Sequence, residues 1–259
     1  MYFPVLRSGV NAQFPVSRVD EYGVITEETP GGGMWRTGTR RAALRRWRLE
    51  LDEVSDEEAL TLIQFYETVR GGWQAFSFAD PMGNLLVWSE DLGKPPWLRS
   101  PAISVTPAGQ PDGEPAEFLI VNGSAAPGEI WQELDLAPGA AVCFSCETLT
   151  PGGPAGRVFS AGAEKRIVLE SGWNRIFVTG SSSGGFQRVG IELEPGATLR
   201  VRRLQAEMQI SPSEYRPTFE IGGVWTKTRF AQDGLTVIAT APGRNRIRIQ
   251  LESAMESVL

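Results

Sequence analysis

Carboxylates, thiols and indoles are the side chains of this sequence that could catalyse a reaction or bind a ligand. Glu90 and Asp91 are adjacent, whereas a glycosidase needs two carboxyl groups on opposite sides of the bond that it cuts. Cys143 and Cys146 lie in AVCFSCET, whose alternation predicts a strand on which the two thiols point to opposite faces. The chain contains no histidine, the commonest general base and metal ligand. We therefore predict no catalytic residues, no metal site and no cofactor, and two buried, reduced thiols.

Tryptophan is the other residue type that could bind a ligand, and the chain has eight of them. Aromatic rings stack on sugar faces, but tryptophan also fills the cores of β-sandwiches. Trp88 and Trp131 lie within strand patterns, which favours burial. Trp97 falls in a predicted loop and Trp173 follows a predicted turn. All four are candidates for contact with a glycan, and the core interpretation stays open beside it.

The composition is that of a folded chain with a modest acidic excess. With 259 residues and 41% hydrophobic content, the sequence can build one large core or two ordinary ones. No apolar run follows the opening MYFPVLRSGVNAQFPV or reaches membrane-spanning length, so we expect a soluble protein that folds in a cytoplasm. A net charge of −6 disfavours sequence-specific binding of nucleic acid.

Arginines crowd one short region, at positions 36, 40, 41, 45, 46 and 48. A phosphate-binding patch is one interpretation, but no aromatic stacking platform accompanies these charges. Where arginine alternates with Trp47, Leu49 and Leu51, the pattern predicts a strand with one apolar and one charged face. The charged face is then either solvated or in contact with another subunit.

A single amphipathic helix is the clearest element, in SDEEALTLIQFYETVRGG. Ser55 and Glu58 have the spacing of a capping box, apolar residues recur at helical spacing, and Gly71 and Gly72 supply the stop. The flanking patterns RRWRLELDEV and WQAFSFAD predict strands. We therefore expect the helix to pack on a sheet.

From Asn84 the sequence changes to short alternating segments separated by glycine and proline, which predicts a sandwich or jelly roll. About eight strands are expected there, as a jelly roll needs. The predicted strands are 117–121, 129–134, 141–148, 157–160, 165–169, 174–179, 187–193 and 198–209.

Three further strands are predicted after YRPT, the last with Ile247, Ile249 and Leu251 on one face and Arg246 and Arg248 on the other. Three strands alone bury little apolar area, so we expect them to complete the sheet begun before residue 84. The predicted fold class is mainly β: a discontinuous sandwich or barrel with one packed helix, residues 1–83 and 219–259, and an inserted jelly roll, residues 84–218.

The two outer segments resemble the distal tail proteins of long-tailed phages and of gene transfer agents. The matching motifs are YFPVLRSGV, RRWRLELDEV, LTLIQFYETVRGGWQAF, FSFADPMGN, TKTRFAQDGLTV and RNRIRIQLES. The resemblance implies a structural virion protein whose subunits form a hexameric ring at the tail tip, between the tail tube protein and the baseplate hub. Charged strand faces suit ring-closing contacts between copies. The interface candidates are Arg40, Arg46, Arg48, Glu50, Arg246 and Arg248.

The inserted segment resembles the carbohydrate-binding-module-like jelly rolls of phage tail proteins. The matching motifs are NLLVWSEDLGKPPWLRS, PDGEPAEFLI, EIWQELDLAPGAAVCFSCET and RLQAEMQISPSEYRPT. The resemblance implies an outward domain that contacts host-surface glycans. The stretch LTPGGPAG departs from the family's basic, glycine-containing stretch, so ligand contacts are not carried over on that side.

Three functional hypotheses follow. The favoured one is a non-enzymatic ring subunit of the tail tip, assembled in the host cytoplasm, with glycan contact as a second task. The alternative is a minor tail protein that acts mainly as a glycan-binding adhesin. A tail-associated glycoside hydrolase that uses Glu90 or Asp91 is disfavoured, because no histidine and no G-x-S-x-G motif accompany these carboxylates.

Overall fold

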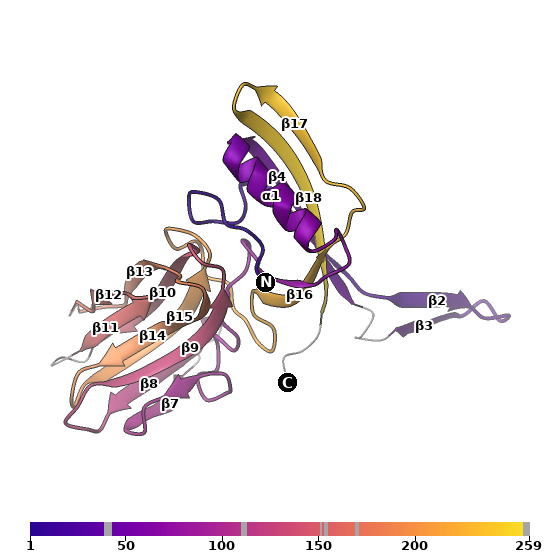
Figure 1. The fold of residues 1–259 in the computed structure, drawn as a ribbon. Coiled ribbons are helices and arrows are strands. Elements are labelled where there is room, and N and C mark those ends of the chain that lie inside the picture. The colour runs from indigo at the N-terminus through magenta and orange to yellow at the C-terminus, as the bar shows by residue number, and fades with distance from the viewer. Residues whose placement is uncertain (39–42, 110–112, 151, 153–154, 169–170, 256–259) are drawn as a thin grey trace. The chain divides into compact units, whose positions relative to one another are not determined.

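The computed structural model describes residues 1–38, 43–109, 113–150, 152, 155–168 and 171–255. Its contacts divide the chain into two compact units. Unit 1 comprises Met1–Pro4, Ala12–Phe78 and Trp225–Leu259, and unit 2 comprises Val5–Asn11 and Ala79–Val224. Strands predominate, one helix is present and no sheet closes into a barrel among the described residues, so the predicted mainly β fold is confirmed (Figure 1).

Unit 1 is built on a six-stranded sheet with the strand order β1-β4-β18-β16-β5, in which β17 pairs with β18 beside β16. The long strand β18 pairs antiparallel with β4 from Asn245 to Ala254, so strands from the two ends of the chain share one sheet. The bounds are β1 Val16–Glu21, β4 Leu44–Val54, β5 Phe76–Ala79, β16 Val224–Phe230, β17 Thr236–Ala241 and β18 Arg244–Ala254.

Alternation decides which face of this sheet is buried. Leu49 and Leu51 of β4 and Ile247 and Ile249 of β18 are fully buried, and Trp47 is 1% exposed. The residues between them are charged, with Arg48 and Arg248 exposed and Glu50 half-buried, which confirms the predicted apolar and charged faces. Burying one such aliphatic side chain contributes about 1.5–3 kcal/mol, which fixes the register of both strands.

Helix α1, Asp56–Thr68, covers the apolar face and begins where the capping box predicts. The Ser55 side chain accepts from the Glu58 backbone N–H, and the Glu58 carboxylate accepts from the Ser55 backbone N–H at 3.0 Å. Phe65 packs edge-on against Phe76 of β5, with ring centroids 5.0 Å apart. Within the described residues, this helix lacks the length and apolar character needed to cross a membrane.

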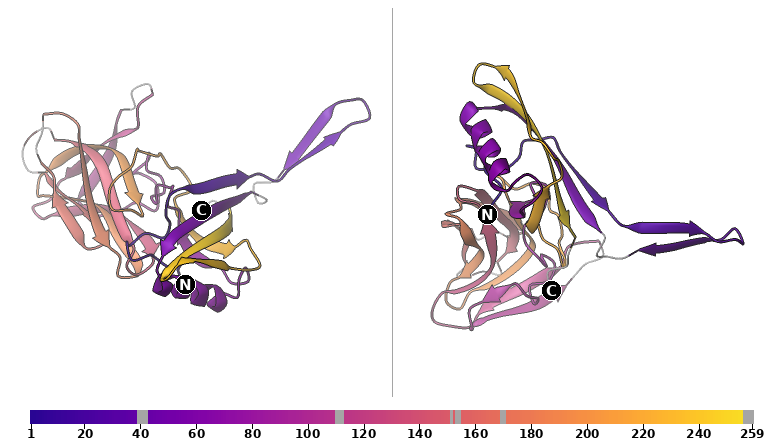
Figure 2. Two further views of the ribbon diagram at one scale, coloured as in Figure 1. Left: turned by 90° about the horizontal axis from the view of Figure 1, so that it is seen from above. Right: turned by 45° about the vertical axis from the view of Figure 1, so that its right-hand side comes forward.

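A hairpin of β2, Val24–Glu28, and β3, Met34–Gly38, forms a separate two-stranded sheet. Figure 2 shows it as a ribbon that extends away from the end of β1, and among the described residues its strands pair only with each other. Ile25 and Trp35 are each 60% exposed. Because neither face of the hairpin is buried, the alternation of its sequence has no counterpart in a core.

Unit 2 is a sandwich of two five-stranded antiparallel sheets. We call them sheet A, with the order β13-β10-β15-β8-β7, and sheet B, with the order β12-β11-β14-β9-β6. The bounds are β6 Leu98–Arg99, β7 Ile103–Gly109, β8 Glu117–Asn122, β9 Gly128–Leu136, β10 Ala141–Leu149, β11 Gly156–Ser160, β12 Ala163–Arg166, β13 Asn174–Ser181, β14 Gly185–Leu193 and β15 Thr198–Glu207.

All eight strands predicted for this segment form, with shifted ends. The strand predicted at 165–169 is β12, which begins two residues earlier, and Leu169 lies outside the described residues. Strands β6 and β7 were not predicted. In β7, the alternation of Ile103 and Val105 ends at Pro107, a residue that weakens a strand pattern and is tolerated at the edge of a sheet.

The core of unit 2 lies between the two sheets. Phe144 and Cys146 of β10 and Val189 and Ile191 of β14 belong to one cluster of fully buried side chains. Cys143 is buried on the other side of β10, so the prediction that the two thiols point to opposite faces is confirmed. Burial raises the pKa of Cys143 to about 11 and that of Cys146 to about 12. Both thiols are free, as predicted.

Buried Asn84 joins the beginning and the end of the sandwich sequence. Its amide nitrogen donates to the carbonyl oxygens of Leu204 at 3.0 Å and of Arg216 at 3.1 Å. Its side-chain oxygen accepts from the backbone N–H groups of Leu86 and Ala206. The motifs NLLVWSE and QAEMQISPSEYRPT are therefore held together by one side chain.

Candidate functional site

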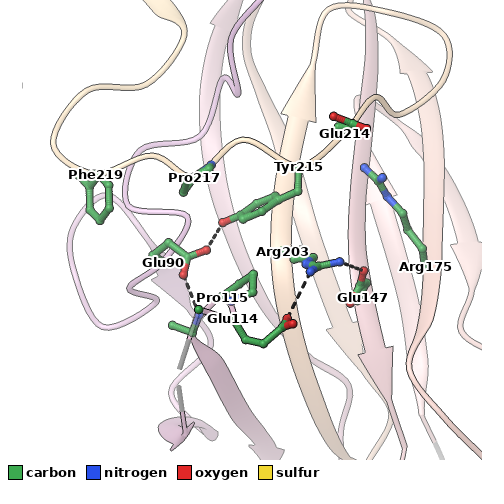
Figure 3. Close-up of a pocket in the computed structure, with 12 residues that line it drawn as sticks. Glu90, Glu114, Pro115, Glu147, Arg175, Arg203, Glu214, Tyr215, Pro217 and Phe219 are labelled. Atoms are coloured by element: carbon green, nitrogen blue, oxygen red, sulfur yellow. Dashed lines mark hydrogen bonds and ion pairs between the residues drawn. The ribbon is translucent and has the colours of Figure 1, made fainter. Parts of the chain in front are cut away.

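A pocket of about 790 Å³ opens on the outer side of sheet A, the side that faces away from the sandwich core. Such a volume suits a small-molecule or oligosaccharide ligand. The residues that line it come from six separate stretches of the chain (Figure 3). They are Glu90, Gly113, Glu114, Pro115, Ala116, Glu147, Arg175, Arg203, Glu214, Tyr215, Pro217 and Phe219.

A β-bulge in β15 supplies the central arginine. Ser145 of β10 pairs with Gln205 and Glu147 pairs with Arg202, so one extra residue is inserted in β15 between these pairs. Arg203 takes a φ of 54°, in the left-handed region that is uncommon for residues other than glycine. The bulge brings two consecutive arginines, Arg202 and Arg203, to the same carboxylate, Glu147, which regular alternation would not do.

We call the outer side of sheet A the pocket face. On it, these arginines and the carboxylates around them form a network of ion pairs. Glu147 accepts from Arg202 at 2.7 Å and from Arg203 at 2.8 Å. Arg203 also reaches Glu114 at 3.3 Å. Glu117, 6% exposed, pairs with Arg200. Because Glu147 is only 13% exposed, solvent screens its ion pairs less than those of exposed pairs.

Trp173 covers part of this network. Its ring centroid lies 4.4 Å from the guanidinium carbon of Arg202 and 5.7 Å from that of Arg200. Cation–π contact with two arginines occupies the ring. The predicted glycan candidate Trp173 therefore lies on the pocket face, but as a cover on its arginines and not among the residues that line the pocket.

Tyr215 and Glu90 form the opposite wall. The Tyr215 hydroxyl hydrogen-bonds to the Glu90 carboxylate and lies 3.0 Å from the Ser89 hydroxyl. Glu90 also accepts from the Ala116 backbone N–H at 2.7 Å. Burial, reinforced by the hydrogen bond to Glu90, raises the pKa of Tyr215 far above its usual value. Tyr215 is therefore a neutral side chain that is locked in place, with its ring along the pocket (Figure 3).

Two charged side chains of the pocket are not used in ion pairs within the described residues. Arg175 of β13 donates to the Ser145 hydroxyl at 3.2 Å, and neither it nor Glu214 has an ion pair there. Both residues are exposed. Figure 3 shows the Arg175 guanidinium directed toward the segment that carries Glu214. A guanidinium and a carboxylate placed in this way offer hydrogen-bond donors and acceptors to the same ligand.

The other predicted tryptophans are not among the residues that line the pocket. Trp97 is 8% exposed and its indole N–H donates to the Trp88 carbonyl oxygen at 2.9 Å, which makes it a core residue and not a ligand platform. Half-buried Trp88 packs edge-on against Phe219, a pocket residue, with centroids 6.5 Å apart. Trp131 of sheet B lies under the guanidinium of Arg188 at 4.1 Å.

The predicted interface residues lie on the exposed side of β4 and β18, and we call this set the charged ladder: Arg46, Arg48, Glu50 and Asp52 with Arg246, Arg248, Gln250 and Glu252. Arg248 pairs with Glu50 at 3.7 Å, Arg46 pairs with Glu252 at 3.1 Å, and Arg246 pairs with Asp52. Arg40, the remaining candidate, lies outside the described residues.

The structure gives the two adjacent carboxylates different tasks. Asp91 accepts from the Gly93 backbone N–H at 3.0 Å and so holds a turn, while Glu90 reaches the pocket wall. Among the described residues, no three His, Cys, Asp or Glu side chains are grouped so that they could hold a metal ion.

Most of the pocket was not predicted from the sequence. The sequence marks Glu90 only as half of a carboxylate pair and Tyr215 only as part of a closing motif. It gives no functional signal at Arg175 or Glu147. One signal was available: the consecutive arginines in TLRVRRLQAE interrupt an otherwise regular alternation, and such an interruption indicates a bulge.

No protein-family model matches the chain, and no curated protein matches it either. Among solved structures, the CBM22-1 xylan-binding domain of Paenibacillus barcinonensis Xyn10C is 14% identical, with 52% of this chain and 100% of that chain covered and a TM-score of 0.41. TmCBM61, in complex with β-1,4-galactotriose, is 18% identical, with 49% and 99% covered and a TM-score of 0.35.

A phage protein is also among the similar structures. The enzymatically active domain of tailspike protein 4 of bacteriophage CBA120 is 10% identical, with 48% of this chain covered and a TM-score of 0.37. The match spans only 21% of the tailspike chain, and 30% of the chain of a Clostridium thermocellum xylanase 10B. At identities and TM-scores this low, none of these similarities transfers a ligand or an activity.

Proposed function

We propose that this chain is a non-enzymatic structural subunit of a phage tail tip, a distal tail protein whose unit 2 binds a host-surface saccharide. Unit 1 is the ring-forming part of this proposal, and it lies within the predicted discontinuous domain 1–83 and 219–259. Unit 2, which contains the predicted inserted domain 84–218 and also the pocket residue Phe219, is its saccharide-binding module. The proposed location is the tip of the virion tail.

The pocket on sheet A is the observation that carries the saccharide part. It combines the ring of Tyr215 and the side chain of Phe219 with an unpaired guanidinium, Arg175, and an unpaired carboxylate, Glu214, within the described residues. Sugars present apolar C–H faces and a rim of hydroxyls that both donate and accept. Aromatic surface beside a few well-placed polar groups complements such a ligand.

The state of the pocket carboxylates favours binding over hydrolysis. Glu147 and Glu114 have their oxygens engaged by Arg202 and Arg203, and Glu90 by Tyr215 and Ala116. A glycosidase needs one carboxylic acid that donates a proton and a second carboxylate aimed at the sugar or at a water. Of the four pocket carboxylates, only that of Glu214 lacks such a partner in the described residues. One carboxylate cannot supply both groups that a glycosidase needs.

The ring part rests on the sequence motifs of the outer segments, and two features of unit 1 support it. Hairpin β2–β3 exposes Ile25 and Trp35 and pairs with no other strand in the described chain. The charged ladder offers a row of exposed ionic groups on an open sheet. Both features suit repeated contacts between copies of one chain.

Saccharide binding is tested with the full-length protein on a broad glycan array, beside two single variants. Arg175→Ala removes a donor of the pocket, and Arg99→Ala removes an exposed arginine of sheet B as its matched control. We expect binding by the parent and the control and at least about a tenfold loss for Arg175→Ala, since a hydrogen bond to a charged group contributes about 1.5–3 kcal/mol. Equal binding by all three proteins would place the ligand elsewhere.

A glycan-binding adhesin without a ring is the second candidate, and the pocket favours it equally. Negative-stain imaging of the purified chain distinguishes the two. Closed rings support the tail-tip subunit. Dispersed single particles that bind glycan, from a chain that is present in purified tails, support the adhesin.

A further inference from the structure

The pocket also carries information about the charge of its ligand. Four carboxylates and two guanidiniums line it, namely Glu90, Glu114, Glu147, Glu214, Arg175 and Arg203. With Glu117, Arg200 and Arg202 of the pocket face included, five carboxylates stand against four guanidiniums, an excess of one negative charge. Partly buried charges act on a ligand with less screening than charges in water. The net field of the lining therefore opposes the entry of an anion.

The arginines do not reverse this balance. Arg203 is committed to Glu147 at 2.8 Å and to Glu114 at 3.3 Å, so an anionic ligand would have to replace an ion pair that already exists. Arg175 is the one guanidinium of the lining without an ion pair in the described residues. Glu214, equally without one, lines the same pocket and offsets it.

We propose that the pocket selects saccharides that are neutral or carry an amino group, and that it rejects saccharides with carboxylate, sulfate or phosphate groups. This inference rests on the proposed saccharide function and adds the chemical class of its ligand. Arg175 and Glu214 together match adjacent hydroxyls, each of which donates one hydrogen bond and accepts another. A carboxylate on the sugar would lose the hydrogen bond that a hydroxyl donates to Glu214 and would face its charge.

The test compares charged and uncharged forms of one glycan on the full-length protein. The probes are the neutral oligosaccharides that give signal on the array, each with its uronate or sulfated counterpart, measured by isothermal titration calorimetry. We expect the acidic counterpart to bind at least about tenfold more weakly, as like-charge opposition across an interface predicts. Preferential binding of uronate, sialylated or sulfated glycans would overturn the proposal.

Two variants assign the discrimination to the pocket. Glu214→Gln removes one negative charge from an exposed position and keeps the size of the side chain. It should reduce the ratio of the affinities for the neutral and acidic probes, the gap between them, by about threefold or more, a change of the size expected for one partly screened charge. Glu133→Gln, exposed on β9 of sheet B, is the matched control and should leave the gap unchanged.

The outcomes separate this inference from the function on which it rests. An unchanged gap in Glu214→Gln overturns the charge inference while saccharide binding stands. Absence of binding to every glycan overturns both, because the proposed function itself then fails.

Discussion

The charged ladder of unit 1 and the pocket face of unit 2 use the same residue types on the same antiparallel geometry, with different results. On the ladder, Arg248 and Glu50 are 64% and 41% exposed and lie 3.7 Å apart. On the pocket face, Arg202 and Glu147 are 15% and 13% exposed and lie 2.7 Å apart. The alternation along a strand decides on which face a charged side chain lies, and it depends only on the local sequence. The strength of its ion pair depends on burial, which is set by tertiary structure.

Two local devices produce that burial on the pocket face. The bulge at Arg202 and Arg203 directs consecutive side chains to Glu147, and Trp173 covers the arginines. The ladder also contains a bulge, because Asn245 pairs with Val54 and Ile247 with Leu51, which inserts one extra residue in β4 beside Asp52. Within the described residues, however, no aromatic ring makes a cation–π contact with the ladder arginines. The cover by Trp173 therefore distinguishes the two faces, and beneath it the arginines and Glu147 form a network in which each member depends on the others.

The largest effect is expected for Glu147→Gln. The change leaves Arg202 and Arg203 without the carboxylate that both contact. We expect the free energy of unfolding of unit 2 to fall by about 2–3 kcal/mol, which is less than for a fully buried pair because Arg203 is 35% exposed. Hydrogen exchange of peptides from β10 and β15 measures it within unit 2. Glu50→Gln, the equivalent change on the ladder, should cost less than about 0.5 kcal/mol. Equal losses would remove the distinction between the two faces.

Tyr215→Phe should have the next largest effect. It removes the hydroxyl that hydrogen-bonds to Glu90 and Ser89, so both side chains lose that hydrogen bond. The free energy of unfolding should fall by about 1–2 kcal/mol. Peptides covering residues 208–219 should exchange faster. Tyr22→Phe, at a position 62% exposed in unit 1, is the control and should be neutral. Unchanged exchange at 208–219 would show that the pocket wall is not held by this hydroxyl.

Salt should separate the two faces more gently. Raising NaCl from about 0.05 M to about 0.5 M shortens the screening length severalfold, so exposed pairs weaken first. We expect β4 and β18 to lose about 0.5 kcal/mol of protection against hydrogen exchange, and β10 and β15 less than half as much. A greater loss in β10 and β15 would mean that the pocket face is solvated.

The smallest effect concerns pH at the edge of unit 1. The Arg45 guanidinium, hydrogen-bonded to Asp20 at 2.6 Å, holds the pKa of that carboxyl below its usual value of 3.8. A lowered folded pKa means that the stabilisation is complete above pH 3.8 and is lost as the pH falls through the folded value, below 3.8. Asp20→Asn should remove this pH-dependent part of the protection of β1. A step at higher pH would contradict the assignment.

The sequence was sufficient for features that depend on local periodicity. The capping box at Ser55 predicted the start of α1, and the alternation of Trp47, Leu49 and Leu51 predicted the buried face of β4. It was insufficient where the partner is distant. Glu90 meets Tyr215 across 125 residues, and no pattern near either residue indicates the contact.

The hairpin β2–β3 shows a second limit. Val24 and Ile25 are exposed by 56% and 60%, so no buried face constrains which residues are apolar. Alternation of apolar and polar residues predicts a strand when one face of that strand is buried in a core. A strand with both faces exposed has no such alternation in its sequence. Trp97 is the converse case, because its predicted loop position left exposure and burial equally open, and the sandwich buries it.

Native mass spectrometry of the full-length chain across a concentration series tests the central claim most directly, that this protein is a ring subunit of a tail tip. With a subunit mass of 28.3 kDa, a six-copy ring has a mass of about 170 kDa. We predict that this species forms as concentration rises and that closed rings accompany it in negative stain. A chain that stays monomeric at every concentration, and is missing from purified tails, would contradict the claim.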